Sequence, residues 1–221
     1  MRYMIHTYKS RRWYVEQYLI PSMWEQGITE DEIYVWDDVE EQGNLFACMN
    51  SFAACKGSLG GTWHLQDDVL ICHDFAKRTR EFAGDQVVCG FCCSCYEPGV
   101  PAAGEVFSVL MWQSSFPCIY IPNRIAAECA EWFYKDARYR PEFAAWVESR
   151  KKDDTFFYTF FVEKHRNDKA FNLAPHLVEH VDYIIGGSTI NQWRRYRTRG
   201  FYFEDDYLVE ELKEKVARAR H

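Results

Sequence analysis

The feature that most constrains this chain is a regular alternation of short apolar runs with segments whose apolar residues recur at helical spacing. The first three apolar runs, which predict buried strands, are Tyr3–Thr7, Ile33–Trp36 and Thr62–Leu65. Helical patterns follow over residues 13–26 and 44–55, and Pro21 is expected to kink or break the first helix. Strands that alternate with helices favour a mostly parallel sheet flanked by helices, so we expect a single α/β domain of Rossmann type.

The same alternation continues through the second half of the chain. Further strands are predicted at 87–95 and 117–121, and residues 69–72 form a short apolar run. Further helices are predicted at 75–82 and 124–135, the second with a buried stripe of Ile125, Cys129, Trp132 and Phe133. Asp74 is expected to cap the helix that begins at Phe75. A later helix, which begins at Asp153 and Asp154, is predicted by four phenylalanines on one face, Phe156, Phe157, Phe160 and Phe161. The tail from Asp206 predicts an amphipathic helix whose apolar positions are Leu208, Leu212 and Val216.

Composition and charge exclude some classes of protein. The chain has 221 residues, of which 48% are hydrophobic and 17% aromatic, so it can bury a sizeable core. Its net charge of −7 argues against a generic nucleic-acid binder, because phosphate binding needs Lys and Arg. Nine scattered cysteines, no secretory signal and no apolar run of membrane-spanning length predict a cytoplasmic location, or the host cytoplasm if the source is viral.

Acidic pairs follow two of the predicted strands. Asp37 and Asp38 come directly after Trp36, and Asp67 with Asp68 come after the strand that ends near Leu65. Ligands of open α/β sheets bind at the carboxyl ends of the strands, and carboxylate oxygens suit Mg²⁺ or Mn²⁺. Adjacent strand residues point to opposite faces, so Asp67 and Asp68 share a ligand only if a turn intervenes. The alternative is that each pair merely caps the following turn.

The segment Gln66-Asp67-Asp68, between a strand and an apolar pair, resembles the xDD form of the DxD element of GT-A fold glycosyltransferases. The resemblance implies that Asp68 binds the metal that bridges the diphosphate of a nucleotide-sugar donor. It implies that Asp67 contacts the donor ribose or sugar. Gln66 stands where many members of the family carry Glu or Asp, so its donor contact departs from the family pattern.

Other segments match this family in the same order along the chain, from about residue 3 to residue 190. The first strand and its basic loop resemble the nucleotide-binding start of the family, and they carry Thr7, Lys9, Arg11 and Arg12. Asp37 resembles the residue that reads the nucleobase or ribose. Asp153-Asp154 resembles the xED element, whose second acid is the catalytic base of inverting members. Residues 175–188 resemble a late segment in which a histidine, here His180, completes the metal site.

The resemblance implies a GT-A-like catalytic domain over residues 1–205, with a nucleotide-binding half at about 1–100 and an acceptor half at about 101–205. Residues 206–221 then form a separate C-terminal helix. The expected activity is an inverting, metal-dependent glycosyltransferase that uses Mn²⁺ or Mg²⁺ and a UDP-sugar such as UDP-glucose. Asp154, with Asp153 beside it, is the expected base, and a helix N-terminus is expected to lower its pKa. The alternatives are ordinary N-capping for these aspartates and a core or surface role for His180.

The acceptor is suggested by one basic and aromatic segment near residue 195. Its candidate acceptor-binding residues are Trp193, Arg194, Arg195 and Arg197. They slightly favour a hydroxymethylated base in DNA, which makes DNA modification the first expectation and a cell-surface glycan precursor the second. A non-catalytic nucleic-acid-binding α/β module is the alternative class. A C-x-x-C pair, Cys92 and Cys95, lies close to Cys89, but no second ligand pair at zinc-finger spacing is evident, so packing in a strand is favoured.

Overall fold

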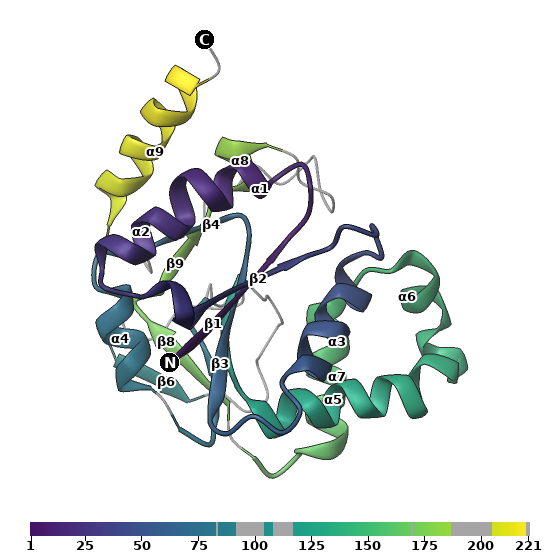
Figure 1. Ribbon diagram of the computed structural model, residues 1–221. Coiled ribbons are helices and arrows are strands. Elements are labelled where there is room, and N and C mark those ends of the chain that lie inside the picture. Colours follow the sequence, from purple (N-terminus) through teal and green to yellow (C-terminus); the bar gives the residue numbers. More distant parts are fainter. Residues whose placement is uncertain (83, 92–103, 108–116, 169, 187–204, 220–221) are drawn as a thin grey trace.

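The computed structural model describes residues 1–82, 84–91, 104–107, 117–168, 170–186 and 205–219, and it shows an α/β fold with helices on both faces of a central sheet (Figure 1). Within these residues the main sheet has seven strands in the order β2-β1-β3-β7-β5-β8-β6. In chain order, its strands are β1 (Arg2–Thr7), β2 (Ile33–Asp37), β3 (Gly61–Gln66), β5 (Val87–Cys89), β6 (Gly104–Phe107), β7 (Cys118–Pro122) and β8 (Ala170–Ala174).

The sheet is mostly parallel, as the alternating pattern predicted. Strand β1 pairs in parallel with both β2 and β3, and β5 pairs in parallel with β8. Strand β7 is antiparallel to its neighbours β3 and β5, and β6 is antiparallel to β8. Five of the seven strands therefore run in the same direction. A separate antiparallel pair, β4 (Val69–Ile71) and β9 (Val178–His180), lies beyond the end of β3.

The helices form two layers, one on each side of the sheet (Figure 1). One layer contains α1 (Arg12–Tyr14), α2 (Ile20–Glu25), α4 (Phe75–Glu81) and, at its outer side, α8 (Asp182–Ile185) and α9 (Asp206–Ala219). The other contains α3 (Asn44–Ala54), α5 (Asn123–Lys135), α6 (Ala144–Ser149) and α7 (Asp153–Lys164). Short 3₁₀ turns occupy Glu30–Glu32, Ala137–Tyr139 and Pro141–Phe143.

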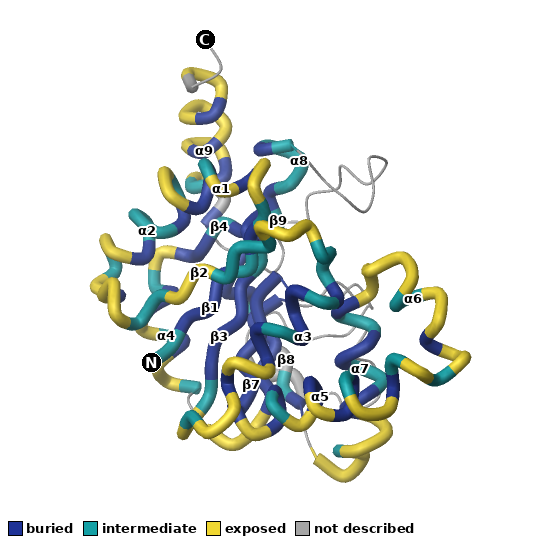
Figure 2. The backbone as a smooth tube through the Cα atoms, turned by 45° about the vertical axis from the view of Figure 1, so that its right-hand side comes forward, coloured by how far each residue is buried: buried dark blue, intermediate teal, exposed yellow. Residues whose placement is uncertain are grey.

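The alternation of side chains along each strand divides the core between these layers. On β7, Cys118 and Tyr120 join the core under α1, α2 and α4, whereas Ile119 and Ile121 join the core under α3, α5 and α7. Figure 2 shows the central strands β1, β3 and β7 mostly buried, with exposure concentrated on the outer helices and loops. The predicted stripe of α5 and the four phenylalanines of α7 all lie in the second core, so both helical patterns are confirmed.

The helix around Pro21 is continuous where a kink or break was predicted. Between α1 and α2, residues Val15–Leu19 form a π-helical stretch, and the Ile20 amide donates to the carbonyl of Val15. A proline ring clashes with the carbonyl of the residue four positions earlier and offers no N–H. The wider π-turn removes that conflict immediately before Pro21, so the helix continues to Glu25.

Three local predictions differ from the structure in detail. Strand β5 ends at Cys89, earlier than the expected Cys95. Asp74 holds the N-cap position of α4 but makes no capping hydrogen bond, and its carboxylate instead accepts one from Cys72 Sγ at 3.3 Å. On α9 the fully buried positions are Val209, Leu212 and Val216, while the expected Leu208 is only partly buried. Among the described residues, no helix combines the length and the apolar character that crossing a membrane requires.

Candidate functional site

The acidic pair Asp67-Asp68 lies at the carboxyl end of β3, in the two-residue turn that leads into β4. Asp67 and Asp68 can share a partner only if a turn interrupts the alternation of side-chain direction along the strand, and this turn does so. Both carboxylates contact the same group, the guanidinium of Arg11. Arg11 Nη1 donates to Asp67 Oδ1 at 3.0 Å and also contacts Asp68 Oδ2. The three side chains are 5–7% exposed, so this ion cluster is buried.

The loop after β1 surrounds Asp67 with hydrogen-bond donors. Thr7 Oγ1 donates to Asp67 Oδ2 at 3.1 Å, and the Tyr8 amide approaches the same oxygen at 3.4 Å. Burial, followed by the charge of Asp68, raises the pKa of Asp67, while Arg11 and Thr7 oppose that rise. Thr7 and Arg11, expected to contact a donor, therefore hold one carboxylate of the acidic pair in this structure.

His180 reaches Asp68 through the small β4–β9 sheet. Val69 is the register partner of His180, and the Val181 amide donates to the Asp68 carbonyl at 2.8 Å. His180 Nε2 lies 3.0 Å from Asp68 Oδ2. Two residues that the sequence singled out in distant segments thus meet in the fold. The role of His180 as a metal ligand stays a prediction from the sequence.

The positive charge of His180 and the negative charge of Asp68 each stabilise the ionised form of the other residue. Burial disfavours ionisation of Asp68, but the His180 charge and hydrogen bond, with Arg11, outweigh it and hold the Asp68 pKa well below its usual range. Burial likewise disfavours the charged imidazole, but Asp68 and then Asp182 raise the pKa of His180 to about 9. Asp182 Oδ1 lies 3.6 Å from His180 Nδ1, on the side of the ring opposite Asp68. His180 is therefore oriented from both of its nitrogens.

The donor atoms around Asp68 fit a divalent cation in part. Within the described residues, Asp68 Oδ1 is buried and has no hydrogen-bond partner, so it is an unsatisfied acceptor. Carboxylate oxygen and imidazole nitrogen together suit Mn²⁺. The described residues hold no ready cluster of three or more His, Cys, Asp or Glu side chains for a metal. Arg11 supplies the positive charge between the two aspartates instead.

The end of β2 lies beside this cluster, because Asp37 is the register partner of Thr7. Arg12, which is 50% exposed, forms an ion pair with Asp37, and Lys9 is exposed in the same loop. Asp38 does not face a ligand: its two carboxylate oxygens accept the Gln42 and Gly43 amides, each at 2.8 Å. The two acids after β2 therefore differ, because Asp38 stabilises the following turn and Asp37 pairs with Arg12. Gln66 ends β3 half-buried, immediately before the acidic pair.

Asp153 and Asp154 occupy the first turn of α7, as predicted, but the two expectations about them need correction. The N-cap position belongs to Lys152, in the left-handed region at φ 73°, so neither aspartate is the N-cap residue. The predicted lowering of the Asp154 pKa is wrong, because burial raises it. Burial, then Asp154 and the charge of Asp68, raise the pKa of Asp153 to about 7. Loss of hydration outweighs the helix N-terminus here.

Several expected site residues lie outside the described part of the chain. These are the candidate acceptor residues Trp193, Arg194, Arg195 and Arg197, together with Cys92 and Cys95 of the C-x-x-C pair. Cys89 is buried on β5. The acceptor prediction therefore stays a prediction from sequence.

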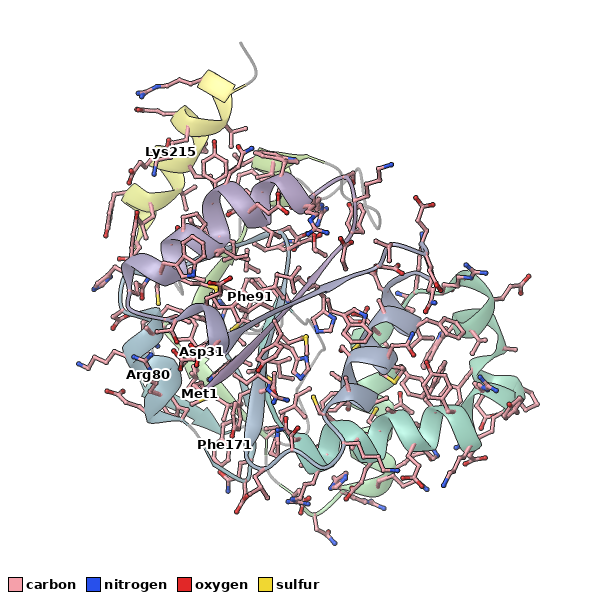
Figure 3. The ribbon with its side chains drawn as sticks, in the orientation of Figure 1. Met1, Asp31, Arg80, Phe91, Phe171 and Lys215 are labelled. Carbon is pink, nitrogen blue, oxygen red and sulfur yellow. The ribbon has the colours of Figure 1, made fainter. Side chains whose placement is uncertain are left out.

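The structure adds two neighbours of His180 that the sequence reasoning did not select. Asp182 follows it by two residues and faces its Nδ1, a spacing that could have suggested an orienting carboxylate. Phe91, labelled in Figure 3, packs its ring against that of His180, with centroids 6.3 Å apart. No sequence pattern pointed to Phe91, because only the fold places the end of β5 beside β9.

Comparisons with known proteins add little to this geometry. The chain matches no protein-family model, and no curated protein matches it. Among solved structures it is similar to the protein of "Crystal Structure of A197 from STIV", with a TM-score of 0.41 and 16% sequence identity. That match covers 81% of this chain and 84% of the other. A similarity this low carries no argument about the activity, so a functional proposal must rest on the cluster of Asp67, Asp68, Arg11 and His180.

Proposed function

We propose that this protein is a metal-dependent glycosyltransferase that transfers a sugar from a nucleotide-sugar donor to a hydroxyl group of an acceptor. The observation that carries the proposal is the meeting of Asp68 and His180, with Nε2 and Oδ2 3.0 Å apart, at the carboxyl end of β3. Ligands of α/β sheets bind at this end of the strands. The resemblance in sequence implies that both residues are metal ligands.

Asp68 and His180 are the side chains that would hold the cation, with the free Oδ1 of Asp68 as the first oxygen ligand. Mn²⁺ or Mg²⁺ bound there would act as a Lewis acid that stabilises the charge of the departing diphosphate. Lys9 in the loop after β1 and Arg12 at the start of α1 are exposed, so they can contact the phosphates. Asp37, beside Thr7 at the end of β2, is placed to accept hydroxyl groups of the nucleoside.

The transfer needs a base near the same site, and α7 supplies two carboxyl groups. In the reaction the acceptor oxygen forms a bond to the anomeric carbon, the bond to the diphosphate breaks with its electron pair, and the acceptor proton passes to a carboxylate. Asp154 is half-buried and is the proposed base, because a raised pKa brings a carboxylate closer to the working pH. Asp153 is the neighbouring residue, and the charge of Asp68 contributes to the rise in its pKa.

Hydrolysis of the donor in the absence of acceptor tests the role of Asp68. Wild type, Asp68→Ala and Asp31→Ala are compared over a panel of nucleotide-sugars with Mn²⁺, beginning with UDP-glucose. We expect Asp68→Ala to lose about 100-fold or more of the turnover, because the charge on the leaving group is no longer stabilised. Circular dichroism of each variant separates loss of chemistry from loss of fold.

Asp31→Ala is the matched control, because it removes one carboxylate far from the site. Asp31 is exposed and lies beside Met1 and Arg80, at the start of β1 (Figure 3). The turnover of Asp31→Ala should stay within about twofold of that of wild type. Equal turnover of wild type and Asp68→Ala would remove the metal-binding role assigned to Asp68.

The acceptor is tested by a separate measurement. A hydroxymethylated base in duplex DNA predicts transfer that falls steeply with salt, because phosphate contacts release counterions. Full transfer to a free sugar without DNA would favour the glycan precursor.

A further inference from the structure

Arg11 occupies an unusual position for a residue expected to bind phosphate. Its guanidinium is buried and points into the acidic pair, where Nη1 donates to Asp67 Oδ1 at 3.0 Å and contacts Asp68 Oδ2. His180 Nε2 approaches the same Asp68 oxygen. The guanidinium therefore lies next to the position between Asp68 and His180 that a metal ion would require.

The charges of the cluster show why the guanidinium and a metal ion exclude each other there. Asp67 and Asp68 are the acids, and Arg11 and His180 are the bases in contact with them. A histidine can bind a metal as the neutral imidazole after it loses its proton. An arginine keeps its charge at every accessible pH. Its guanidinium would stand against the dication in a buried site, where repulsion between like charges is strong.

The position of Arg11 in the chain allows its side chain to move away from Asp67 and Asp68. It belongs to the loop between β1 and α1, where Lys9 and Ser10 are exposed. Its Nε has no hydrogen-bond partner among the described residues, and its guanidinium carbon lies 5.3 Å from the centre of the Tyr8 ring. Lys9 lies in the same loop and Arg12 begins α1 directly after it, so a released guanidinium joins two cations already near the expected phosphates.

We propose that Arg11 is an internal counterion that neutralises Asp67 and Asp68 and that a divalent cation must displace when it binds, which releases the guanidinium toward the donor diphosphate. This inference rests on the proposed function. It makes the cation and the donor bind cooperatively, because donor phosphates stabilise the displaced Arg11. The cation alone then binds weakly, since it competes with an arginine that the protein itself supplies.

Calorimetric titration with Mn²⁺ alone, without nucleotide, tests this competition. The proteins are wild type, Arg11→Gln, Arg124→Gln and Asp68→Asn. We expect Arg11→Gln to bind Mn²⁺ about tenfold more tightly than wild type or better. Arg124→Gln removes the same charge from an exposed residue beside the start of β3, at the opposite end of that strand from the acidic pair, so its affinity should stay within about twofold of wild type. Asp68→Asn should lose Mn²⁺ binding, because it removes the proposed carboxylate ligand.

Titration in the presence of UDP completes the test. UDP should strengthen Mn²⁺ binding to wild type more than binding to Arg11→Gln, because only wild type has a guanidinium to release. Arg11→Lys serves if Arg11→Gln does not fold: a lysine keeps the charge but cannot hold two carboxylates with one planar group, so Mn²⁺ should bind it more tightly than wild type.

The outcomes separate the two claims. Equal Mn²⁺ affinity of wild type and the Arg11 variants, with binding lost in Asp68→Asn, overturns the role of Arg11 and leaves the proposed function in place. Absence of Mn²⁺ binding to every protein, with and without UDP, overturns both.

Discussion

At the scale of single residues, the carboxyl groups near the end of β3 differ because their surroundings differ. Asp68 has His180 and Arg11 as partners and is held ionised. Asp153 is also buried, but the charges of Asp154 and Asp68 add to the effect of burial on its pKa. Burial therefore raises its pKa from 3.8 to about 7. The same type of side chain is thus an anion at Asp68, whereas at Asp153 it keeps its proton up to about pH 7.

The raised pKa of Asp153 predicts a pH dependence of stability. Below pH 4 both the folded and the unfolded chain carry the proton, and the contribution of this group to stability is fully present. Between about pH 4 and 7 only the folded chain keeps the proton, so this contribution is lost as the pH rises through the folded pKa of about 7. Asp153→Asn removes the titration. Relative to wild type, it should gain on the order of 2 kcal/mol in free energy of unfolding between pH 4.5 and pH 8.

Urea unfolding of wild type and Asp153→Asn at pH 4.5, 6 and 8 measures this difference. Asp31→Asn, which removes one carboxylate at an exposed position, is measured beside it as the control. A constant difference for Asp153→Asn across the same range would contradict the raised pKa.

At the scale of elements, one close contact positions the start of α7. Gly43, just before α3, has φ +85°, and a Cβ built on it would lie 2.6 Å from Arg150 Cβ and 2.8 Å from the Arg150 carbonyl oxygen. The Leu45 amide donates to that same carbonyl at 3.1 Å. The loop that leads to Asp153 therefore rests directly on the backbone at the start of α3.

Replacement of Gly43 tests this contact. Gly43→Ala should lower the free energy of unfolding by about 2–4 kcal/mol, because the positive φ is strained and the new methyl group meets backbone atoms that cannot yield. Gly27→Ala is the matched control, since Gly27 has φ +77° but no atom within 4 Å of an added Cβ. It should lose about 1 kcal/mol from strain alone. Urea unfolding measures both, and equal losses would show that the Arg150 contact does not matter.

At the scale of the whole molecule, the sheet brings the segments of the site to one end of its strands. Thr7 ends β1, Asp37 ends β2, and Asp67 and Asp68 follow β3. The sheet itself is buried between two hydrophobic cores, so its strand ends form a rigid base for the loops. A ligand that bridges several of these loops should therefore stabilise the entire fold.

Thermal unfolding measures that stabilisation. A ligand at about 100 times its Kd stabilises the folded state by about 2.7 kcal/mol, which corresponds to a rise in Tm of about 5–10 °C for a chain of this size. We expect this rise for wild type with UDP and Mn²⁺ together, and no rise for Asp68→Ala. A non-catalytic nucleic-acid-binding module would instead respond to DNA and not to UDP with Mn²⁺, which would contradict the transferase assignment.

Local patterns in the sequence determined most of the secondary structure. The phenylalanines of α7 and the apolar stripe of α5 follow the helical repeat, which depends only on residues three and four positions apart. The strand ends near Asp37 and Asp67 were likewise visible, because apolar runs stop there. Resemblance to a known family selected Asp68 and His180, but no local pattern places them in contact.

The tertiary structure alone decided how these residues act. The contact of His180 with Asp68 depends on the pairing of β4 with β9, and the bridge from Arg11 depends on the β1 loop folding over the β3 turn. The direction of the Asp154 pKa was predicted wrongly for the same reason, because burial is set by helices packed from elsewhere in the chain. Periodicity is a property of neighbours along the chain, whereas charge, hydration and coordination depend on neighbours in space.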